Sequence, residues 1–532
     1  MILMRKICLT LIFVFVTVTS SFASSKEIVY NLGADPRTID PALNNASDGS
    51  VVIRNIFEGL VRFNFNDEIE PACAESWEIS EDELKWTFHL RDNLKWSDGE
   101  KLTASQFRDG FLRLLNPETG SPYAYYGFFI KNGEAFYNGS AKAEEVGVSA
   151  PDEKTLVLEL EYKNPLIMDY FEFPVFLPVR MDIVNNAERT WAAKPETLIS
   201  NGAFKLESWV HGDGGKITLV KNPEYWEADK VKIDRLNFVM IADENTALAA
   251  FRAGRIDYMG SIPSQMLPML LKRGEAKSYP ALGTAYCSFN VNKPPFDDVR
   301  VRKAFTLAID RRIIIDKILM GDQRPATGFV CDLVPGTTSE KDFRNEGGNF
   351  LPERADIKEA KRLLAEAGYP DGKGFPKVSY KYNSNPGNKS MAEALQGMWK
   401  KYLGIEVELQ NEEWKVFIET RRKKDFDIAR EAWIMDFYDA ANLLECLISN
   451  SPQNDTGYNN EKFDTAMKNS SIETDHVKRI NYLHEAENYI MEDMPVAPIY
   501  FYSSVVMQSK RVKNIYRSAI GTLIFRGAEI VE

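Results

Sequence analysis

Patterns typical of strands and of helices alternate along the second half of the chain, and this alternation limits the possible folds more than any other sequence feature. Residues 405–410 (Ile-Glu-Val-Glu-Leu-Gln) alternate apolar and polar side chains, as a half-buried strand does. Residues 86–91 (Trp-Thr-Phe-His-Leu-Arg), in the first half, show the same period. Strands that alternate with helices favour an α/β fold over an all-β sandwich.

Two helices are predicted from their first residues. Asp356 is followed by an apolar face that Gly368 closes. Asp297 or Asp298 is expected to cap another helix that runs to a stop near Gly321. No linker rich in Ser, Gly or Pro separates these elements, which favours domains that are interleaved along the chain.

The first 23 residues predict export. Arg5 and Lys6 precede an apolar run over residues 7–18, and the small-residue site 21–23 follows. This is the pattern of a signal peptide, residues 1–23, cleaved after Ala23. No later run of this kind occurs, so the mature chain is expected not to span a membrane. Because Cys8 lies near the start of the apolar run, free release into a periplasm is favoured over lipid anchoring.

Length and charge set further limits. Cleavage leaves 509 of 532 residues and changes the net charge from −12 to −14. At roughly 150 residues per domain this length predicts about three domains. An acidic chain is poorly suited to nucleic acids or anionic membranes. The four remaining cysteines form no C-x-x-C pair, so disulfides and buried free thiols both stay open: Cys73, Cys287, Cys331 and Cys446.

The sequence contains no recognisable catalytic or metal-binding motif. His484-Glu485 begins like a zinc-protease motif, but Asn488 stands where the second histidine is needed. Residues 212–216 (Gly-Asp-Gly-Gly-Lys) are better explained as a hairpin turn than as a phosphate loop. We therefore expect no cofactor and no metal. A carboxylate pair for glycoside hydrolysis remains open in a chain with 77 acidic residues.

Asp436 is the strongest candidate for a ligand contact. It lies within Ala-Trp-Ile-Met-Asp-Phe-Tyr, residues 432–438, with no basic residue beside it. An ionised carboxylate in apolar surroundings is costly unless a cation meets it. The alternative is an Asp that ends a strand or caps a helix. The basic end of a predicted helix, at Arg421, would suit an anion. Together the two residues would suit a zwitterion such as a peptide.

Nine ordered motifs resemble those of the extracellular solute-binding proteins of the peptide and nickel importers. Among these proteins, the periplasmic oligopeptide-binding proteins are the branch that the chain resembles most. The nine motifs cover essentially the whole mature chain: residues 58–61, 74–77, 87–91, 95–99, 201–204, 221–226, 253–257, 299–304 and 310–311.

The resemblance implies a periplasmic-binding-protein-like α/β fold, with two lobes joined by a hinge and an additional inserted domain. The first lobe would comprise residues 24–57, 183–282 and 504–532. The inserted domain would span residues 58–182, and residues 283–503 would form the lobe with the main ligand contacts.

The resemblance also implies residue roles. Asp436 would bind the α-amino group of a peptide, Arg421 would receive its C-terminal carboxylate, and Tyr123 would flank the amine. The remaining expected peptide-binding residues line the cleft: Arg430, Trp414, Trp433, Tyr502, Tyr286, Asn388, Asn45, Ala46 and Ser47. Asn388 stands where a His can meet the carboxylate of a longer peptide. Ala440 replaces a usual Pro after Asp439, so the pocket floor is expected to differ.

By this resemblance the protein is a periplasmic receptor, not an enzyme, that captures oligopeptides and delivers them to the permease and ATPase subunits of an ABC importer. It is expected to be a monomer. A binder of murein peptide, dipeptide, haem or nickel is the nearest alternative, and a secreted hydrolase is a further one.

Overall fold

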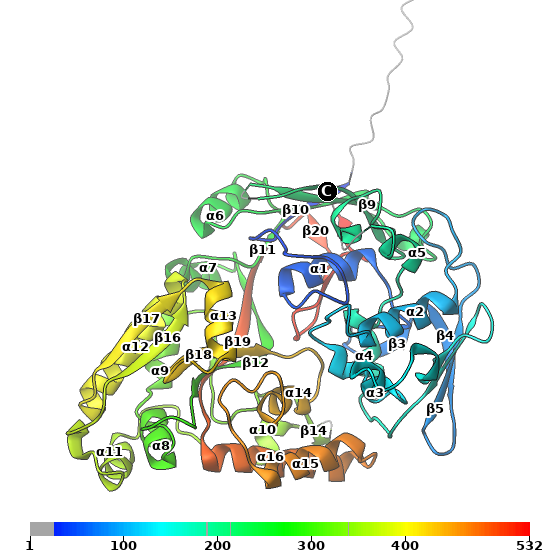
Figure 1. Cartoon of the computed structure of the whole chain (residues 1–532). Coiled ribbons are helices and arrows are strands. Elements are labelled where there is room, and N and C mark those ends of the chain that lie inside the picture. Colours follow the sequence, from blue (N-terminus) through cyan, green and yellow to red (C-terminus); the bar gives the residue numbers. More distant parts are fainter. Residues whose placement is uncertain (1–25, 188–189, 213, 339, 532) are drawn as a thin grey trace, which may run out of the picture.

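The computed structural model describes residues 26–187, 190–212, 214–338 and 340–531. The predicted signal peptide, residues 1–23, lies outside these ranges. Within them, no helix combines the length and the apolar character needed to cross a membrane. Figure 1 shows three parts: a first lobe around β9 and β10, an inserted part around α2 and β5, and a second lobe around β16 and α12.

A mixed sheet of 11 strands runs through both lobes in the described part of the chain, and β13 (Arg324–Pro325) pairs with β19 at its side. In spatial order the other strands are β17 (Val407–Glu412), β16 (Val378–Asn383), β18 (Ile428–Ile434), β12 (Lys277–Phe289), β19 (Val496–Gln508), β11 (Tyr258–Met259), β1 (Glu27–Asn31), β10 (Arg235–Val239), β9 (Lys216–Lys221) and β8 (Phe204–Val210).

Two long antiparallel strands, β12 and β19, connect the lobes. Each has 13 residues, whereas a typical strand has five or six. One end of β12 pairs with β18 in the second lobe, and β19 reaches β11 in the first lobe. The register shifts between Pro280 and Thr284, where Pro cannot donate a ladder hydrogen bond. These crossing strands form the hinge that the fold class requires.

The inserted part has its own antiparallel sheet. Its strands, in spatial order, are β4 (Ala74–Ile79), β5 (Lys85–Leu90), β7 (Thr155–Glu159) and β6 (Val148–Ser149). Trp86, Phe88 and Leu90 alternate inward along β5, which confirms the period predicted for residues 86–91. The sheet lies within the segment predicted as the inserted domain, and the domain limits stay a prediction.

Shorter strand pairs complete the β structure: β2 (Val61–Phe63) with β3 (Ile69–Pro71), β14 (Pro335–Thr338) with β15 (Lys341–Asp342), β20 (Val512–Lys513) with β23 (Glu529–Ile530), and β21 (Tyr516–Arg517) with β22 (Leu523–Ile524).

The α-helices cover the sheets. They are α1 (Ser47–Ile56), α2 (Ala104–Leu115), α3 (Gly133–Tyr137), α4 (Ile167–Glu172), α5 (Met181–Val184), α6 (Glu244–Arg252), α7 (Leu267–Lys272), α8 (Val299–Leu307), α9 (Arg311–Ile313), α10 (Phe343–Gly347), α11 (Ile357–Glu366), α12 (Pro386–Leu403), α13 (Trp414–Arg422), α14 (Ala441–Leu444), α15 (Glu461–Ile472) and α16 (His476–Asp493).

Both predicted helix starts are confirmed. The carboxylate of Asp356 accepts a hydrogen bond from the backbone N–H of Glu359, and that of Asp298 accepts one from Arg300. The prediction of one continuous helix is wrong, because α8 already ends at Leu307. The predicted stop near Gly321 agrees with a π-helix, Ile314–Leu319, which ends there. Asp310 adopts an extended backbone and caps a new short helix, α9.

Two further sequence interpretations can be compared with the structure. Strand β8 ends at Val210 and the antiparallel β9 begins at Lys216, as a hairpin turn over residues 212–216 requires, although residue 213 is not described. The choice between disulfides and thiols is settled: all four cysteines are buried and free.

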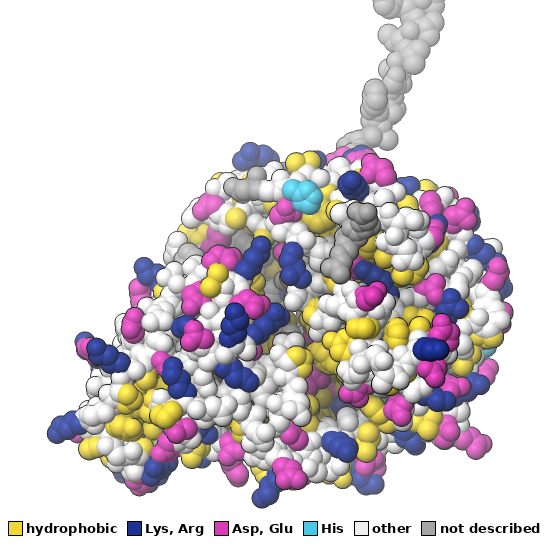
Figure 2. All heavy atoms as spheres, viewed as in Figure 1, with side chains coloured by type: hydrophobic (Ala, Val, Ile, Leu, Met, Phe, Trp, Pro, Cys, Tyr) yellow, Lys and Arg dark blue, Asp and Glu magenta, His cyan; other side chains and the backbone are white. Residues whose placement is uncertain are grey.

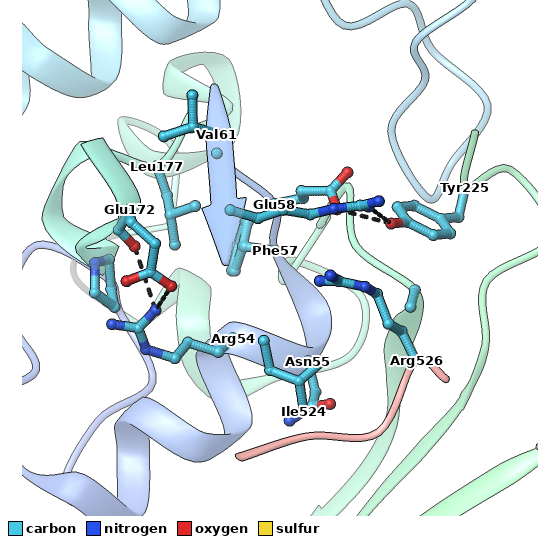
Figure 3. Close-up of a pocket in the computed structure, with 14 residues that line it drawn as sticks. Arg54, Asn55, Phe57, Glu58, Val61, Glu172, Leu177, Tyr225, Ile524 and Arg526 are labelled. Atoms are coloured by element: carbon cyan, nitrogen blue, oxygen red, sulfur yellow. Dashed lines mark hydrogen bonds and ion pairs between the residues drawn. The ribbon is translucent and has the colours of Figure 1, made fainter. Parts of the chain in front are cut away.

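A buried ion pair fastens the first lobe to the inserted part. Arg54 of α1 pairs with Glu172 of α4, and Figure 3 shows the two side chains meeting. Burial raises the pKa of Glu172, while the Arg54 charge opposes that rise.

Candidate functional site

The carboxyl group of Asp436 lies just beyond the end of β18 and is half-buried. Its Oδ2 accepts a hydrogen bond of 3.3 Å from the hydroxyl of Tyr126, which belongs to the inserted part. Among the described residues it forms no ion pair with Lys, Arg or His. Burial raises the pKa of Asp436 to about 7, and the hydrogen bond from Tyr126 limits the rise. A carboxyl group of this kind is ready to receive a cation.

Asn442 of α14 fixes the segment around Asp436. Its Oδ1 accepts hydrogen bonds from Trp433 Nε1 at 3.0 Å and from the backbone N–H of Asp436 at 2.8 Å. Its Nδ2 donates to the Tyr126 hydroxyl and to Glu445. All of its polar atoms are therefore used, and Trp433 is held beside the Asp436 backbone. The alternative of Asp436 as a helix cap does not apply, since its carboxylate caps no helix.

A second carboxyl group, that of Glu445, lies beside the first. Glu445 Oε1 lies 3.0 Å from the Tyr126 hydroxyl, so the two carboxyl groups share one phenol. Burial and the charge of Asp436 raise the pKa of Glu445 to about 8, against hydrogen bonds from Tyr126 and Asn442. Sequence reasoning missed Glu445, Asn442 and Tyr126. The one available signal for Tyr126 was its place in the same Tyr-rich run as Tyr123.

Aromatic rings form the wall around these carboxyl groups. Tyr123 and Tyr126 stack at 5.6 Å with nearly parallel planes, and both contact Phe173 edge-on. Burial and the nearby charge of Asp436 raise the pKa of Tyr123. Tyr123 thus lies close enough to Asp436 for that charge to act on it, and its role beside the amine of a ligand stays a prediction.

Arg421 lies at the end of α13 but is already paired. Its Nη1 lies 3.0 Å from Glu431 Oε1, and its Nε lies 3.2 Å from Asp455 Oδ2. Burial and the charge of Glu431 raise the pKa of Asp455 to about 7, although Arg421 lowers it. Sequence reasoning also missed these two acids. A ligand carboxylate would have to compete with both of them for Arg421, whose role as a receptor stays a prediction.

Arg430, on β18, is less occupied than Arg421. Its Nη2 donates to the hydroxyl of Tyr502 on β19 at 3.3 Å, so these two predicted residues do meet. Its Nε is enclosed and has no hydrogen-bond partner in the described part of the chain. No described acid forms an ion pair with it. Of the two predicted arginines, Arg430 is the one that no described acid neutralises.

The positions of the other predicted residues do not decide whether these residues contact a ligand. Tyr286 is buried on β12, where burial and the Glu431 charge raise its pKa. Trp414 begins α13 and is 50% exposed. Asn388 binds the oxygens of Asn383 through its own side chain. Residues 45–47 are exposed at the start of α1. Their roles toward a ligand stay predictions.

The described residues contain no group of three His, Cys, Asp or Glu that could hold a metal ion. His484 stacks on Phe343 with ring centroids 3.9 Å apart and faces Glu346. This residue therefore packs as part of the second lobe.

The lining of the cavity in Figure 3 contains none of the predicted peptide-binding residues. The cavity is lined by the Arg54–Glu172 pair, Glu58, Tyr225 and Arg526, and has a volume of about 40 Å³. This volume suits roughly one water molecule. On the outer surface, Figure 2 shows Lys and Arg side chains gathered near the position of α13, in agreement with a solvated basic helix end.

Residues 68–455 match the model of the bacterial extracellular solute-binding proteins, family 5. The chain belongs to this family. Oligopeptide-binding protein OppA of Bacillus subtilis is 36% identical over 507 residues, which cover 94% of this chain and 91% of that protein. The family assignment and the fold class from the sequence are thereby confirmed.

Solved structures agree. Haemophilus influenzae OppA, in complex with RPPGFSPFR, superposes with a TM-score of 0.82 at 32% identity, covering 96% of this chain and 99% of that one. Escherichia coli MppA, a murein tripeptide binding protein, superposes at 0.84 with 34% identity and the same coverage. Its unliganded open form reaches 0.72, with 34% identity and coverage of 96% and 98%. The overall structure of this chain is thus less similar to that open form than to the other MppA structure.

Proposed function

We propose that the protein is a periplasmic receptor that captures oligopeptides between its lobes and delivers them to the permease and ATPase subunits of an ABC importer. The observation that carries this proposal is the half-buried Asp436 carboxyl group, which has no cationic partner among the described residues and lies where the inserted part meets the second lobe. The α-ammonium group of a peptide supplies the missing cation.

Strand β18, which ends just before Asp436, also offers a site for the C-terminal end of a peptide. β18 lies inside the sheet, with β12 and β16 as its neighbours, and carries Arg430 six residues before Asp436. Arg430, with Tyr502 beside it, offers a guanidinium to a C-terminal carboxylate. Contacts with main chain and termini do not depend on side chains, so many sequences can be accepted. The relatives named OppA support peptides as the cargo class.

Titration calorimetry tests the proposal. Ala-Ala-Ala should bind, and N-acetyl-Ala-Ala-Ala should bind at least about 100-fold more weakly, because loss of one partner of a buried ion pair costs about 3–5 kcal/mol. Asp436→Asn should weaken Ala-Ala-Ala to a similar degree. Equal affinity for both peptides would remove Asp436 from the site and overturn the proposal.

Mass spectrometry of the recovered ligand separates the alternatives. A receptor returns its peptide intact, whereas cleavage products would indicate a hydrolase. A haem or nickel binder would bind neither the free nor the acetylated peptide. We further infer a monomer, which size-exclusion chromatography with light scattering would test.

A further inference from the structure

Two carboxyl groups compete for one phenolic hydrogen at the predicted amine end. The hydroxyl of Tyr126 lies 3.3 Å from Asp436 Oδ2 and 3.0 Å from Glu445 Oε1. A phenol has a single hydrogen, so it donates at full strength to one of the two. If both carboxyl groups were ionised, the other contact would bring two acceptor oxygens together. One of the pair therefore holds a proton until a cation arrives.

Asn442 cannot resolve this conflict. Its oxygen already accepts from Trp433 Nε1 and from the Asp436 backbone, which fixes the direction of the amide. Its Nδ2 donates to the Tyr126 oxygen at 3.1 Å and to Glu445 Oε1 at 3.2 Å. Both of its hydrogens are used, so Asn442 orients the carboxyl pair without neutralising it.

No basic side chain of the described residues neutralises the pair either. The nearby cations are committed elsewhere, Arg54 to Glu172 and Arg479 of α16 to Asp439. The other titratable groups that face the pair are the thiol of Cys446 and the phenols of Tyr123, Tyr125 and Tyr170, and burial raises the pKa of each. These groups are neutral near pH 7 and carry no compensating positive charge.

The Tyr125 hydroxyl adds a further polar group beside the two carboxyl groups. Its oxygen is enclosed and has no hydrogen-bond partner among the described residues. Burial raises the pKa of Tyr125, and the charges of Glu445 and Asp436 raise it further, which places this phenol close to both carboxyl groups. The site thus presents two carboxyl groups and an unused phenol, an arrangement that suits a donor-rich cation.

We propose that Glu445 is a specificity-determining residue that, with Asp436, forms a two-carboxyl receptor favouring peptides whose first residue carries a second cationic group. This inference rests on the proposed function and deepens it. The α-ammonium group binds Asp436, and the second ammonium group takes the place of the proton on Glu445, which passes to solvent. The Tyr125 oxygen offers a further acceptor to the same ligand.

The test compares two peptides of the same shape, ornithyl-Ala-Ala and norleucyl-Ala-Ala, by calorimetry at pH 7.5. In the wild-type protein the ornithyl peptide should bind about tenfold or more tightly, as expected for one added charge-assisted hydrogen bond. In Glu445→Gln this ratio should fall to about 1. Glu419→Gln, on the exposed face of α13, removes the same charge away from the site and should keep the wild-type ratio.

Proton release gives a second measurement. Titrations in buffers of different ionisation enthalpy should show more protons released with the ornithyl peptide than with the norleucyl peptide, and Glu445→Gln should abolish the difference. Equal binding of both peptides by the wild-type protein would overturn the role of Glu445, even if the variant failed to fold. Failure of the proposed function looks different, because N-acetylation would then leave peptide affinity unchanged.

Discussion

The hydroxyl of Tyr126 lies 3.3 Å from Oδ2 of Asp436, although 310 positions separate the two residues in the chain. Tyr126 belongs to the inserted part and Asp436 to the second lobe. The hydrogen bond therefore joins two parts of the molecule at the point where we expect the amino end of a ligand. It couples the placement of the inserted part to the ionisation of Asp436.

Replacing Tyr126 with Phe should weaken binding of Ala-Ala-Ala by about tenfold, the typical effect of one hydrogen bond to a charged group. The hydrogen bond from Tyr126 lowers the pKa of Asp436, so its loss should also raise that pKa. Calorimetry from pH 6 to 8 measures both effects. Tyr489→Phe removes a surface hydroxyl that contacts Glu485, and should leave affinity unchanged. Equal loss in both variants would contradict the role of Tyr126.

The contribution of Asp436 and Glu445 to the stability of the empty protein should fall as pH rises from about 4 to about 8. Asp436 and Glu445 have folded-state pKa values of about 7 and about 8, above the ordinary values of 3.8 and 4.5. Between these limits the two groups hold more protons in the folded state than in the unfolded state, so their contribution to the free energy of unfolding falls with increasing pH.

Asp436→Asn removes one of these titrations. Between pH 4 and pH 8, the free energy of unfolding of the variant should rise relative to that of the wild type by on the order of 1–4 kcal/mol, at about 1.36 kcal/mol per unit of pKa shift. Urea unfolding at both pH values measures this difference. A stability difference that does not change with pH would show that the carboxyl group is ordinary.

Arg421 should matter first for stability. Arg421→Met leaves Glu431 and Asp455 buried without their shared cation, and should lower the free energy of unfolding by about 3–5 kcal/mol. Arg422→Met, on the next residue of the same helix, removes an exposed pair with Glu419 and should cost less than about 1 kcal/mol. Urea unfolding distinguishes the two. Similar small costs would mean that Arg421 is free for a ligand.

Arg430 should matter first for binding. With Arg430→Met we expect the protein to lose its preference for Ala-Ala-Ala over Ala-Ala-Ala-amide, because the guanidinium that meets the carboxylate is gone. The wild-type preference should be about tenfold or more. Calorimetry with both peptides measures it. An unchanged preference in the variant would contradict the role of Arg430 and favour Arg421 or Asn388 as the residue that binds the C-terminal carboxylate.

Local signals were sufficient for much of the fold. The period of residues 86–91 placed β5, and Asp356 and Asp298 marked helix starts because a cap acts within three residues of itself. The end of α8 at Leu307 was missed, since the apolar pattern continues through Ile309 and gives no sign that Asp310 starts a new helix.

The residues of the candidate site likewise divide into those with a local sequence signal and those without one. Asp436 was found because its neighbours in sequence are aromatic. Glu445, Glu431 and Asp455 were missed because each gains its meaning from a partner far along the chain, such as Tyr126 for Glu445. In a chain with 77 acidic residues, sequence alone does not separate a paired buried acid from a solvated one.

The course of β19 also bears on how the chain reaches its folded state. Strand β1, with Glu27 near the start of the described residues, pairs with β11, and β11 pairs with the end of β19 at Met507 and Gln508. The sheet of the first lobe is therefore complete when nearly the whole chain has emerged. Pairing over such sequence separations is slow. We therefore expect the first lobe to complete its sheet only late, after the residues of β19 have joined β11.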